Sequence, residues 1–262
     1  LIPLMAKGIG NGDAVITTTF TYIATAEVIS LLGATPIFID IYPKTYNLNP
    51  ELIPNAIQHA HMIGLKPKAL ISVDLFGLPA RYRIIKDIAN NYDLFVIEDG
   101  AQGFGGKIKD QSVGSFGDIS STSFFPAKPL GCYGDGGAIF TDNDDLAEIM
   151  RSIRIHGSGN NKYNNVRIGI NGRLDTIQAA ILLEKLTIFD EEVKSRNQIA
   201  NYYLSNISNK YSLPYVPNNY SSSWAQFSIV AKSENQRNIV LKKLQKENIP
   251  SAIYYKTPLQ SN

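Results

Sequence analysis

The feature that most constrains the fold is an alternation of short apolar runs with helical segments along the first part of the chain. Runs typical of buried strands lie at 14–18, 35–39, 69–73 and 94–97. Between them, apolar residues recur at helical spacing in the segments 22–32, 50–61 and 81–92. Parallel strands need crossover connections of this length. The alternation therefore predicts an α/β fold with a mostly parallel sheet that is covered by helices on both faces.

Polar residues follow predicted strands at their carboxyl ends. They are Asp40, Asp74, Asp99 and Ser123. Ligands of open parallel sheets bind just outside these ends of the strands. The four side chains are therefore candidates for a binding site.

A glycine-rich segment follows Asp99. Ten of the 20 glycines lie between residues 100 and 137, which indicates backbone in unusual conformations or in close contact with a ligand. Lys128 lies in this segment, among phenylalanines and prolines and without an acidic neighbour in the sequence. Burial there would lower the pKa of the lysine and favour the neutral amine that reacts with an aldehyde. The alternative is an ordinary solvated lysine.

Asp99 also has two interpretations. Its carboxylate could anchor the loop that follows the strand, or it could face a bound cation. If Asp99 and Lys128 share one crevice, they supply what pyridoxal phosphate (PLP) requires, an acid for the protonated ring nitrogen and an amine for the aldehyde.

The pattern changes in the second half of the chain. A helix is predicted at 143–155, a polar loop at 157–165 and a long helical pattern from Asp175 to about Leu204. Further on, the sequence predicts a strand at 224–230, a charged helix at 234–247 and a strand at 252–255. We therefore expect a large domain at 1–188 and a smaller α+β domain at 189–262.

Composition excludes several classes of function. The net charge is +2 and no long run of like charges occurs, so we expect no nucleic-acid partner. No apolar stretch approaches the roughly 18–20 residues of a membrane span, so we expect no membrane partner and a cytoplasmic location. Cys132 is the only cysteine, which excludes an internal disulfide framework and a zinc site with several cysteines. We assign no metal site.

Four separated segments carry a resemblance to a known family. They are 20–26, 98–102, 123–131 and 169–173. In this order they resemble the DegT/DnrJ/EryC/StrS family of PLP-dependent nucleotide-sugar aminotransferases, and the match spans nearly the whole chain. The string at 124–137 is most similar to the branch that aminates UDP-2-acetamido-3-keto-glucuronate at its 3-keto position.

The resemblance implies a fold and an activity. The fold would be that of aspartate aminotransferase, fold type I of the PLP-dependent transferases. The reaction would move an amino group from glutamate to a nucleotide-linked keto sugar, for surface polysaccharide (lipopolysaccharide O-antigen) or amino-sugar biosynthesis. The family also implies a homodimer with a shared active site. A related branch that dehydrates its substrate has histidine in place of the lysine, and Lys128 argues against it.

The resemblance further implies roles around the cofactor ring. Lys128 would bond to the cofactor aldehyde and later move the substrate proton. Asp99 would pair with the ring nitrogen, and Gln102 would lie near the phenolic oxygen of the ring. Tyr22 would stack on the ring face. Taken alone, Tyr22 is equally an ordinary residue of an amphipathic helix.

Four more residues are implied as contacts of the phosphate and the substrate. Ser123 would donate its hydroxyl to the cofactor phosphate, and Asn171 would reach that phosphate from the neighbouring subunit. Arg173 and Tyr255 would contact the substrate, the arginine through a carboxylate. In isolation, Ser123 could instead end its strand, and Asn171 could be a turn residue.

The sequence also departs from the family pattern. A glycine–threonine pair that binds the cofactor phosphate would precede Leu1, so we expect this chain to be part of a longer protein, incomplete at both ends. The stretch 254–260 resembles a family motif but differs from it at Tyr254, Lys256 and Gln260. One alternative is therefore a non-catalytic homologue or fragment that binds a sugar nucleotide without transamination. An unrelated nucleotide-binding enzyme is disfavoured, because no G-x-G-x-x-G or Walker pattern follows a strand.

Overall fold

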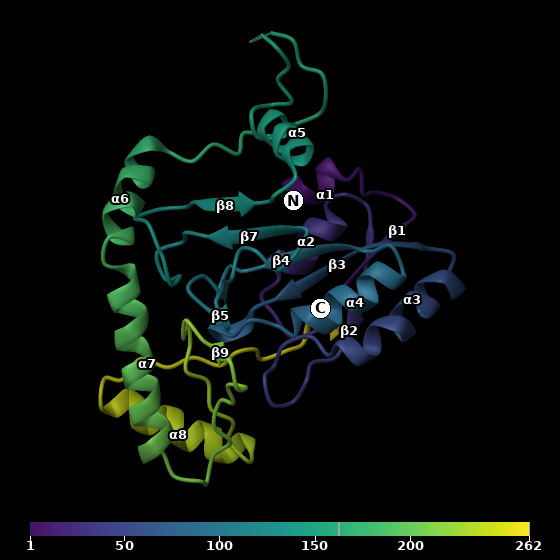
Figure 1. Cartoon of the computed structure of the whole chain (residues 1–262). Helices are drawn as coiled ribbons and strands as arrows, with labels where there is room; N and C mark the ends of the chain where they lie inside the picture. Colours follow the sequence, from purple (N-terminus) through teal and green to yellow (C-terminus); the bar gives the residue numbers. More distant parts are fainter. Residues whose placement is uncertain (162, 262) are drawn as a thin grey trace.

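The central element is a twisted sheet, seen in a computed structural model that describes residues 1–161 and 163–261. Within that part of the chain, six strands pair in the order β2-β1-β3-β4-β7-β8 (Figure 1). They are β1 (Asp13–Thr18), β2 (Thr35–Ile39), β3 (Lys66–Val73), β4 (Phe95–Asp99), β7 (Ile119–Ser123) and β8 (Gly137–Phe140). All pairs are parallel except β7 with β8. The predicted mostly parallel sheet is confirmed.

Helices cover both faces of this sheet because its strands are apolar on both sides. Val15 and Ile71 face a layer that contains α1 (Ile2–Ala6), α2 (Ala24–Ser30) and α5 (Asp144–Arg154). Ile16 and Leu70 are the sequence neighbours of Val15 and Ile71. They face α3 (Ile53–Met62) and α4 (Tyr82–Asn91) on the opposite side of the sheet. Successive strand residues point to opposite faces, so these continuous apolar runs form two hydrophobic clusters.

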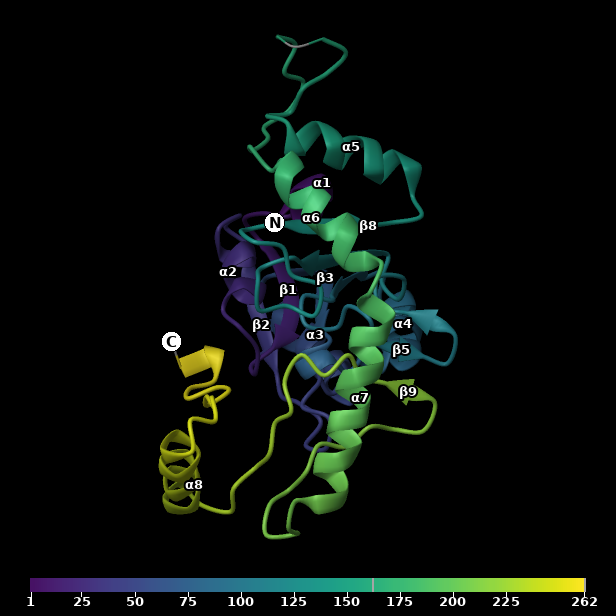
Figure 2. The ribbon, with the colours of Figure 1, turned by 90° about the vertical axis from the view of Figure 1, so that its left-hand side faces the viewer.

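The long helical pattern after Asp175 forms two helices. They are α6 (Thr176–Leu186) and α7 (Phe189–Asn206), which follow one another along one side of the molecule (Figure 2). The helix is interrupted at Thr187, whose hydroxyl donates a hydrogen bond of 2.7 Å to the Glu184 carbonyl. Such a bond competes with the backbone hydrogen bonds of a helix. The domain boundary expected between residues 188 and 189 lies next to this interruption, and the division into two domains stays a prediction.

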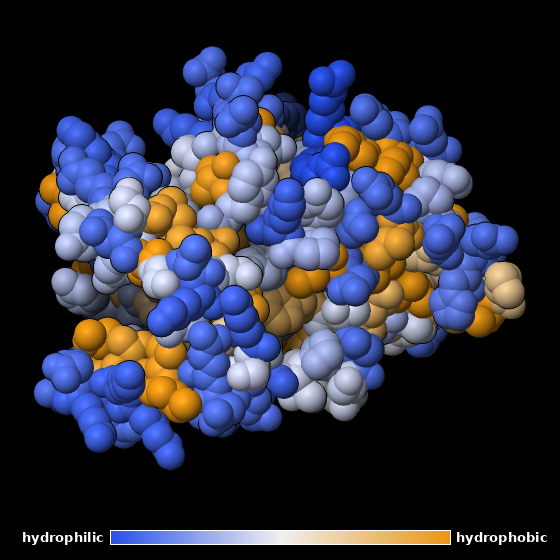
Figure 3. Space-filling view, turned by 90° about the horizontal axis from the view of Figure 1, so that it is seen from below, coloured by the Kyte–Doolittle hydropathy of each residue, from blue (hydrophilic) through white to orange (hydrophobic). Residues whose placement is uncertain are grey.

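The C-terminal region contains α8 (Glu234–Lys246), which stands apart from α7 in Figure 2 and has no buried side chain among its described residues. A second small sheet pairs β9 (Tyr220–Ser221) with β5 (Lys107–Ile108), which in turn pairs with β6 (Gln111–Ser112). One edge of the C-terminal region thus continues a sheet from the first half of the chain. The face seen from below mixes hydrophilic surface with exposed apolar patches (Figure 3).

Two predicted strands in this region are wrong. In 224–230, Trp224 has φ 50°, and Val230 forms only an isolated bridge with Ser212. The apolar residues there pack as an aromatic pair instead, with the rings of Trp224 and Phe227 5.5 Å apart. The segment 252–255 pairs with no strand among the described residues. A strand of a sheet needs several successive paired residues, and the single bridge of Val230 does not provide them.

Three short 3₁₀ helices complete the described chain. They are η1 (Pro50–Leu52), η2 (Leu75–Gly77) and η3 (Leu259–Ser261). Over residues 1–161 and 163–261, no helix combines the length and apolar character needed to cross a membrane.

Candidate active site

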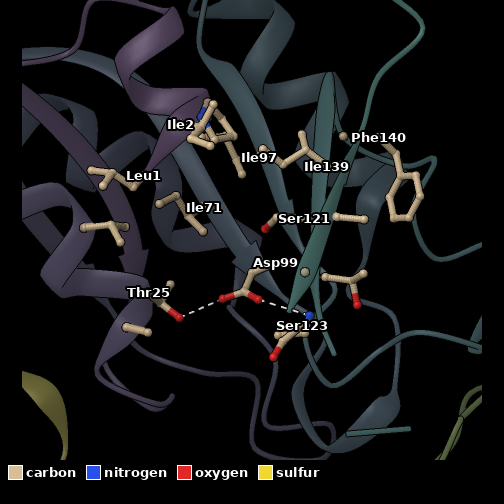
Figure 4. A pocket seen from close by; sticks show the side chains of 18 of the residues that line it. Leu1, Ile2, Thr25, Ile71, Ile97, Asp99, Ser121, Ser123, Ile139 and Phe140 are labelled. Carbon is tan, nitrogen blue, oxygen red and sulfur yellow. Dashed lines mark hydrogen bonds between the residues drawn. The ribbon is translucent and has the colours of Figure 1, made fainter. Parts of the chain in front are cut away.

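A cavity of about 2000 Å³ opens at the carboxyl ends of β4 and β7 (Figure 4). Six of the residues singled out in the sequence line it: Tyr22, Asp99, Gln102, Ser123, Lys128 and Tyr255. The cavity also extends along an apolar wall formed by Ile71, Ile97 and Ile139. Its volume exceeds the several hundred Å³ typical of a site for one small molecule. Cofactor and substrate could therefore both be accommodated.

Lys128 lies in a tight turn after β7, where its own amide donates a hydrogen bond of 2.8 Å to the Phe125 carbonyl. Burial lowers the pKa of the Lys128 ammonium below its ordinary value, and the nearby Asp99 carboxylate offsets part of that decrease. The amine is thus easier to deprotonate than that of a solvated lysine. This is the state that attacks an aldehyde.

Asp99 is the last residue of β4, and both of its carboxylate oxygens accept hydrogen bonds (Figure 4). Oδ2 accepts from the Thr25 hydroxyl at 2.8 Å, and Oδ1 accepts from the Ala101 amide at 3.2 Å. The carboxylate therefore anchors its own loop and also lines the cavity. That it faces a bound cation stays a prediction. Sequence reasoning did not identify Thr25, which lies 74 positions away in the chain.

Gln102 is buried, and its side chain connects two other segments. Its Oε1 accepts a hydrogen bond of 2.7 Å from the Phe76 amide, and its Nε2 donates to the Tyr255 hydroxyl at 3.3 Å. The Ser223 hydroxyl donates to the Gln102 carbonyl at 3.0 Å. Gln102 thereby ties the turn after β3 and two C-terminal segments to the rim of the cavity.

Ser123 and Tyr22 also line the cavity. Ser123 ends β7, and its Oγ accepts a hydrogen bond of 3.3 Å from the Phe125 amide. Tyr22 precedes α2 and is 59% exposed although it lines the cavity. A ring so exposed can stack on a bound flat molecule.

Asn171 and Arg173 are not brought to the cavity by this chain. Both are exposed and neither lines it. Asn171 forms a backbone bridge with Ile155, just after α5. The expectation that Asn171 acts across a subunit boundary stays a prediction.

The turn that carries Lys128 is held from outside by α6 and α7. Lys185 Nζ donates to the Gly131 carbonyl, and Arg196 Nη2 donates to the Pro129 carbonyl at 3.3 Å. Gln178 Oε1 accepts from the Tyr133 amide at 2.8 Å. Sequence analysis missed these three residues, because their partners are backbone groups that leave no side-chain pattern.

Cys132 is part of the same turn and is buried. Its thiol donates to the carbonyls of Phe124 and Gly134 at 3.0 and 3.1 Å. The thiol thus has a structural role within the turn.

The side chains of the cavity fit PLP. A desolvated amine, a carboxylate, a hydroxyl and an exposed aromatic ring line one cavity at the carboxyl end of a parallel sheet. These match the aldehyde, the cationic ring nitrogen, the phosphate and the flat ring of this cofactor. The fold and this site define a PLP-dependent transferase of the aspartate aminotransferase type.

Comparison with known proteins identifies the family. The model of the DegT/DnrJ/EryC1/StrS aminotransferase family matches residues 1–262. The chain belongs to this family, whose members are PLP-dependent sugar aminotransferases, and the family predicted from the four segments is confirmed.

Three relatives illustrate the similarity. The chain is 46% identical over 256 residues to the UDP-2-acetamido-2-deoxy-3-oxo-D-glucuronate aminotransferase of Pseudomonas aeruginosa, covering 97% of this chain and 68% of the relative. A crystal structure of a family aminotransferase from Brucella abortus aligns with a TM-score of 0.96 at 50% identity, over 100% of this chain and 69% of that one. NtdA of Bacillus subtilis, solved with PMP as its bound cofactor, aligns with a TM-score of 0.88 at 30% identity. The alignment covers 100% of this chain and 59% of NtdA.

Proposed function

We propose that this protein transfers an amino group from glutamate to the keto group of a nucleotide-linked sugar, with a UDP-linked 3-keto hexuronic acid as the substrate. The observation that carries the proposal is the convergence of Lys128 and Asp99 on one cavity. The choice of sugar rests on the Pseudomonas aeruginosa relative, which is named for a UDP-linked 3-oxo-glucuronate.

The chain's own residues would divide the work as follows. When bound, PLP supplies an electron sink that stabilises charge developing on the neighbouring carbon. Lys128 Nζ would hold the cofactor and then take and return the substrate proton. The Asp99 carboxylate would keep the ring nitrogen protonated, because a negative charge nearby favours the cationic form.

Other contacts would orient the two ligands. Tyr22 would stack on the ring, and Gln102 would lie by its phenolic oxygen. The Ser123 hydroxyl would donate to the phosphate. Asn171 of a second copy would reach the same phosphate, and Arg173 and Tyr255 would contact the sugar substrate.

A homodimer would bring Asn171 to a second active site. Support comes from exposed apolar side chains on α6 and beside the lysine turn: Ile177 and Leu183 in α6 are 75% and 66% exposed, and Tyr133 is 75% exposed. Large exposed apolar side chains can be covered at a protein contact. The occupant would be a second copy of this chain.

Light scattering tests the dimer. We expect a dimer mass for the unchanged protein and a monomer mass for Leu183→Glu, because a buried charge at the interface is costly. Leu31→Glu, at a similarly exposed leucine outside α6, is the control and should leave the dimer intact. A monomer mass for the unchanged protein would contradict the proposal.

Absorbance spectroscopy tests the cofactor role of Lys128. We expect added PLP to produce a visible band that disappears in Lys128→Ala and persists in Lys246→Ala, a control at an exposed position in α8. Amino transfer should then be assayed with glutamate and the 3-keto sugar nucleotide. Sugar-nucleotide binding without the band or transfer would favour the non-catalytic alternative.

Three expectations from the sequence stay predictions. They concern the cytoplasmic location, the place of the reaction in polysaccharide or O-antigen synthesis, and the division into domains at 1–188 and 189–262.

A further inference from the structure

Two acidic side chains are buried behind the site, on the face of the sheet opposite the cavity. Asp74 directly follows β3, and Glu98 precedes Asp99 in β4. Both acids are fully buried, and neither lines the cavity. Val73 and Asp99, their neighbours in the chain, do line it. Because successive strand residues point to opposite faces, the two acids lie behind the carboxyl end of the sheet.

The backbone distinguishes the two carboxyl groups. Both oxygens of Glu98 accept hydrogen bonds from backbone amides. The three donors are Gly114 at 2.7 Å, Phe116 at 2.8 Å and Gly117 at 3.4 Å. Asp74 accepts one such bond, from the Ala80 amide to Oδ1 at 2.9 Å, and its Oδ2 has no partner in the described part of the chain. Amide donors favour the ionised form of a carboxyl group, whereas burial without a donor favours the protonated form. Glu98 is therefore the charged acid, and Asp74 carries a proton on Oδ2.

No cation compensates a second negative charge at this place. Among residues 1–161 and 163–261, neither acid forms an ion pair with a lysine or arginine. The titratable groups that face Asp74 are themselves acids: Glu98, Tyr82 of α4 and Tyr220 of β9. Burial and the charge of Glu98 raise the pKa of Asp74 well above its ordinary value. Burial also raises the pKa of Glu98, but its three amide donors offset part of that increase. A charged carboxylate is a stronger acceptor than the Tyr82 hydroxyl, so Glu98 is the acceptor for the Asp74 proton.

The two acids connect the ends of β3 and β4 to the loops that follow. Asp74 holds the turn at 74–80 through the Ala80 amide, and Glu98 holds the loop at 114–117. The Asp74 amide also donates a hydrogen bond of 3.0 Å to the Asp99 carbonyl. The backbone of Asp99 is thus fixed between the two buried acids.

We propose that Asp74 and Glu98 hold one proton between them, with the O–H of Asp74 donating to the Glu98 carboxylate, and that this pair positions Asp99 from behind the sheet. Loss of the proton at alkaline pH would place two charges there and loosen the strand ends. Neither acid touches the cavity, so both are positioning residues. The link to Asp99 rests on the proposed function, because it requires Asp99 to face the cofactor. The assignment of the proton does not.

Amide substitutions in the full chain test which acid holds the proton. Asp74→Asn keeps an acceptor for the Ala80 amide and a donor toward Glu98, so its melting temperature at neutral pH should be nearly unchanged. Glu98→Gln places an NH₂ group against a backbone amide, and two donors cannot pair. We expect its melting temperature to fall by roughly 5 °C, the effect of one buried unsatisfied group. Failure of Glu98→Gln to fold while Asp74→Asn folds is the same asymmetry.

Matched controls carry the same changes at exposed positions. They are Asp87→Asn in α4 and Glu148→Gln in α5. Both should melt as the unchanged protein does.

Infrared spectroscopy of the cofactor-free protein detects the proton directly. A protonated carboxyl group absorbs apart from a carboxylate, so the unchanged protein should show such a band at neutral pH, where solvated acids are ionised. The band should be lost in Asp74→Asn and kept in Asp87→Asn. A spectrum without the band, a band that Asp74→Asn leaves in place, or a lower melting temperature for Asp74→Asn than for Glu98→Gln would overturn the assignment.

PLP titrations over a range of pH test the positioning role. Lys128 titrates in both proteins, so the dissociation constant of the unchanged protein divided by that of Asp74→Asn isolates the acid pair. We expect this ratio to be close to one at neutral pH and to rise several-fold at the pH where the infrared band is lost. A ratio that stays constant through the loss of the band would overturn the role in positioning Asp99. Failure of the proposed function itself differs, because the unchanged protein would then lack a Lys128-dependent absorbance band with PLP while the infrared result would stand.

Discussion

Thr25 in α2 donates a hydrogen bond of 2.8 Å from its hydroxyl to Oδ2 of Asp99 at the end of β4 (Figure 4). This bond joins a helix from the start of the chain to the carboxylate expected to face the cofactor. It holds one carboxylate oxygen in place while the Ala101 amide holds the other. Asp99 is thus oriented before any ligand binds.

Replacing Thr25 by valine removes this bond while keeping the β-branched shape. We expect the dissociation constant of PLP to rise about five- to ten-fold, the equivalent of about 1 kcal/mol for one hydrogen bond. Titration of PLP followed by absorbance measures the change. Thr17→Val is the control, because Thr17 donates to the Ile71 carbonyl and not to Asp99. Equal PLP affinities for Thr25→Val and the unchanged protein would show that the bond does not orient Asp99.

The reactivity of Lys128 should depend on pH and on Asp99. Burial lowers the pKa of this amine, so its acetylation should reach half of its maximum below the pH at which a solvated lysine does. Because the Asp99 carboxylate favours the charged amine, Asp99→Asn should move the midpoint to still lower pH. Competitive acetylation of the cofactor-free protein, read by mass spectrometry, gives both midpoints. An upward shift in Asp99→Asn would contradict this electrostatic coupling.

Asp74 should make the protein less stable as the pH rises. Its side chain is fully buried, and its Oδ2 has no hydrogen-bond partner among the described residues. Burial raises the pKa of Asp74 well above its ordinary value, and the buried Glu98 carboxylate raises it further. The folded protein therefore keeps a proton that the unfolded chain releases above about pH 4. This contribution to stability is complete below that pH and is lost as the pH rises toward the folded-state pKa.

Asp74→Asn tests this dependence, since an amide has the same shape and no titration. We expect the free energy of unfolding of the variant to decline less steeply between pH 4 and neutrality, as measured by urea denaturation. Asp87→Asn, at an exposed position in α4, should keep the slope of the unchanged protein. If the free energy of unfolding of Asp74→Asn declined more steeply with pH than that of the unchanged protein, the predicted direction would be contradicted.

Arg196 and Lys185 should stabilise the turn that carries Lys128, although neither side chain lines the cavity. Arg196→Met removes the donor to the Pro129 carbonyl while keeping a long apolar side chain, and Lys185→Met does the same for the Gly131 carbonyl. We expect a several-fold loss of PLP affinity and faster amide exchange across the turn, because each bond contributes about 1 kcal/mol. Lys194→Met, at an exposed lysine of α7 that pairs only with Glu191 among the described groups, is the control. Unchanged exchange rates in both variants would show that the turn is rigid without them.

The sequence alone determined the sheet and the two principal side chains of the site. Continuous apolar runs separated by helical periodicity predict buried parallel strands, and the strands from β1 to β4 formed where that pattern placed them. Asp99 and Lys128 were recognisable because the first ends a strand and the second lies in a glycine-rich loop with a specific motif. Such signals are local, so they can be read from neighbouring residues.

Tertiary structure decided the rest, because the remaining interactions join distant residues or involve the backbone. Residues 224–230 resembled a strand, but among the described residues only Val230 found a bridge partner, Ser212. Thr25, Lys185 and Arg196 hold the site through a carboxylate and two carbonyls that lie 74, 54 and 67 positions away. A backbone carbonyl is the same in every residue, so nothing in the sequence marks which one a lysine or arginine will bind. Only the packing of α2, α6 and α7 against the sheet brings these partners together.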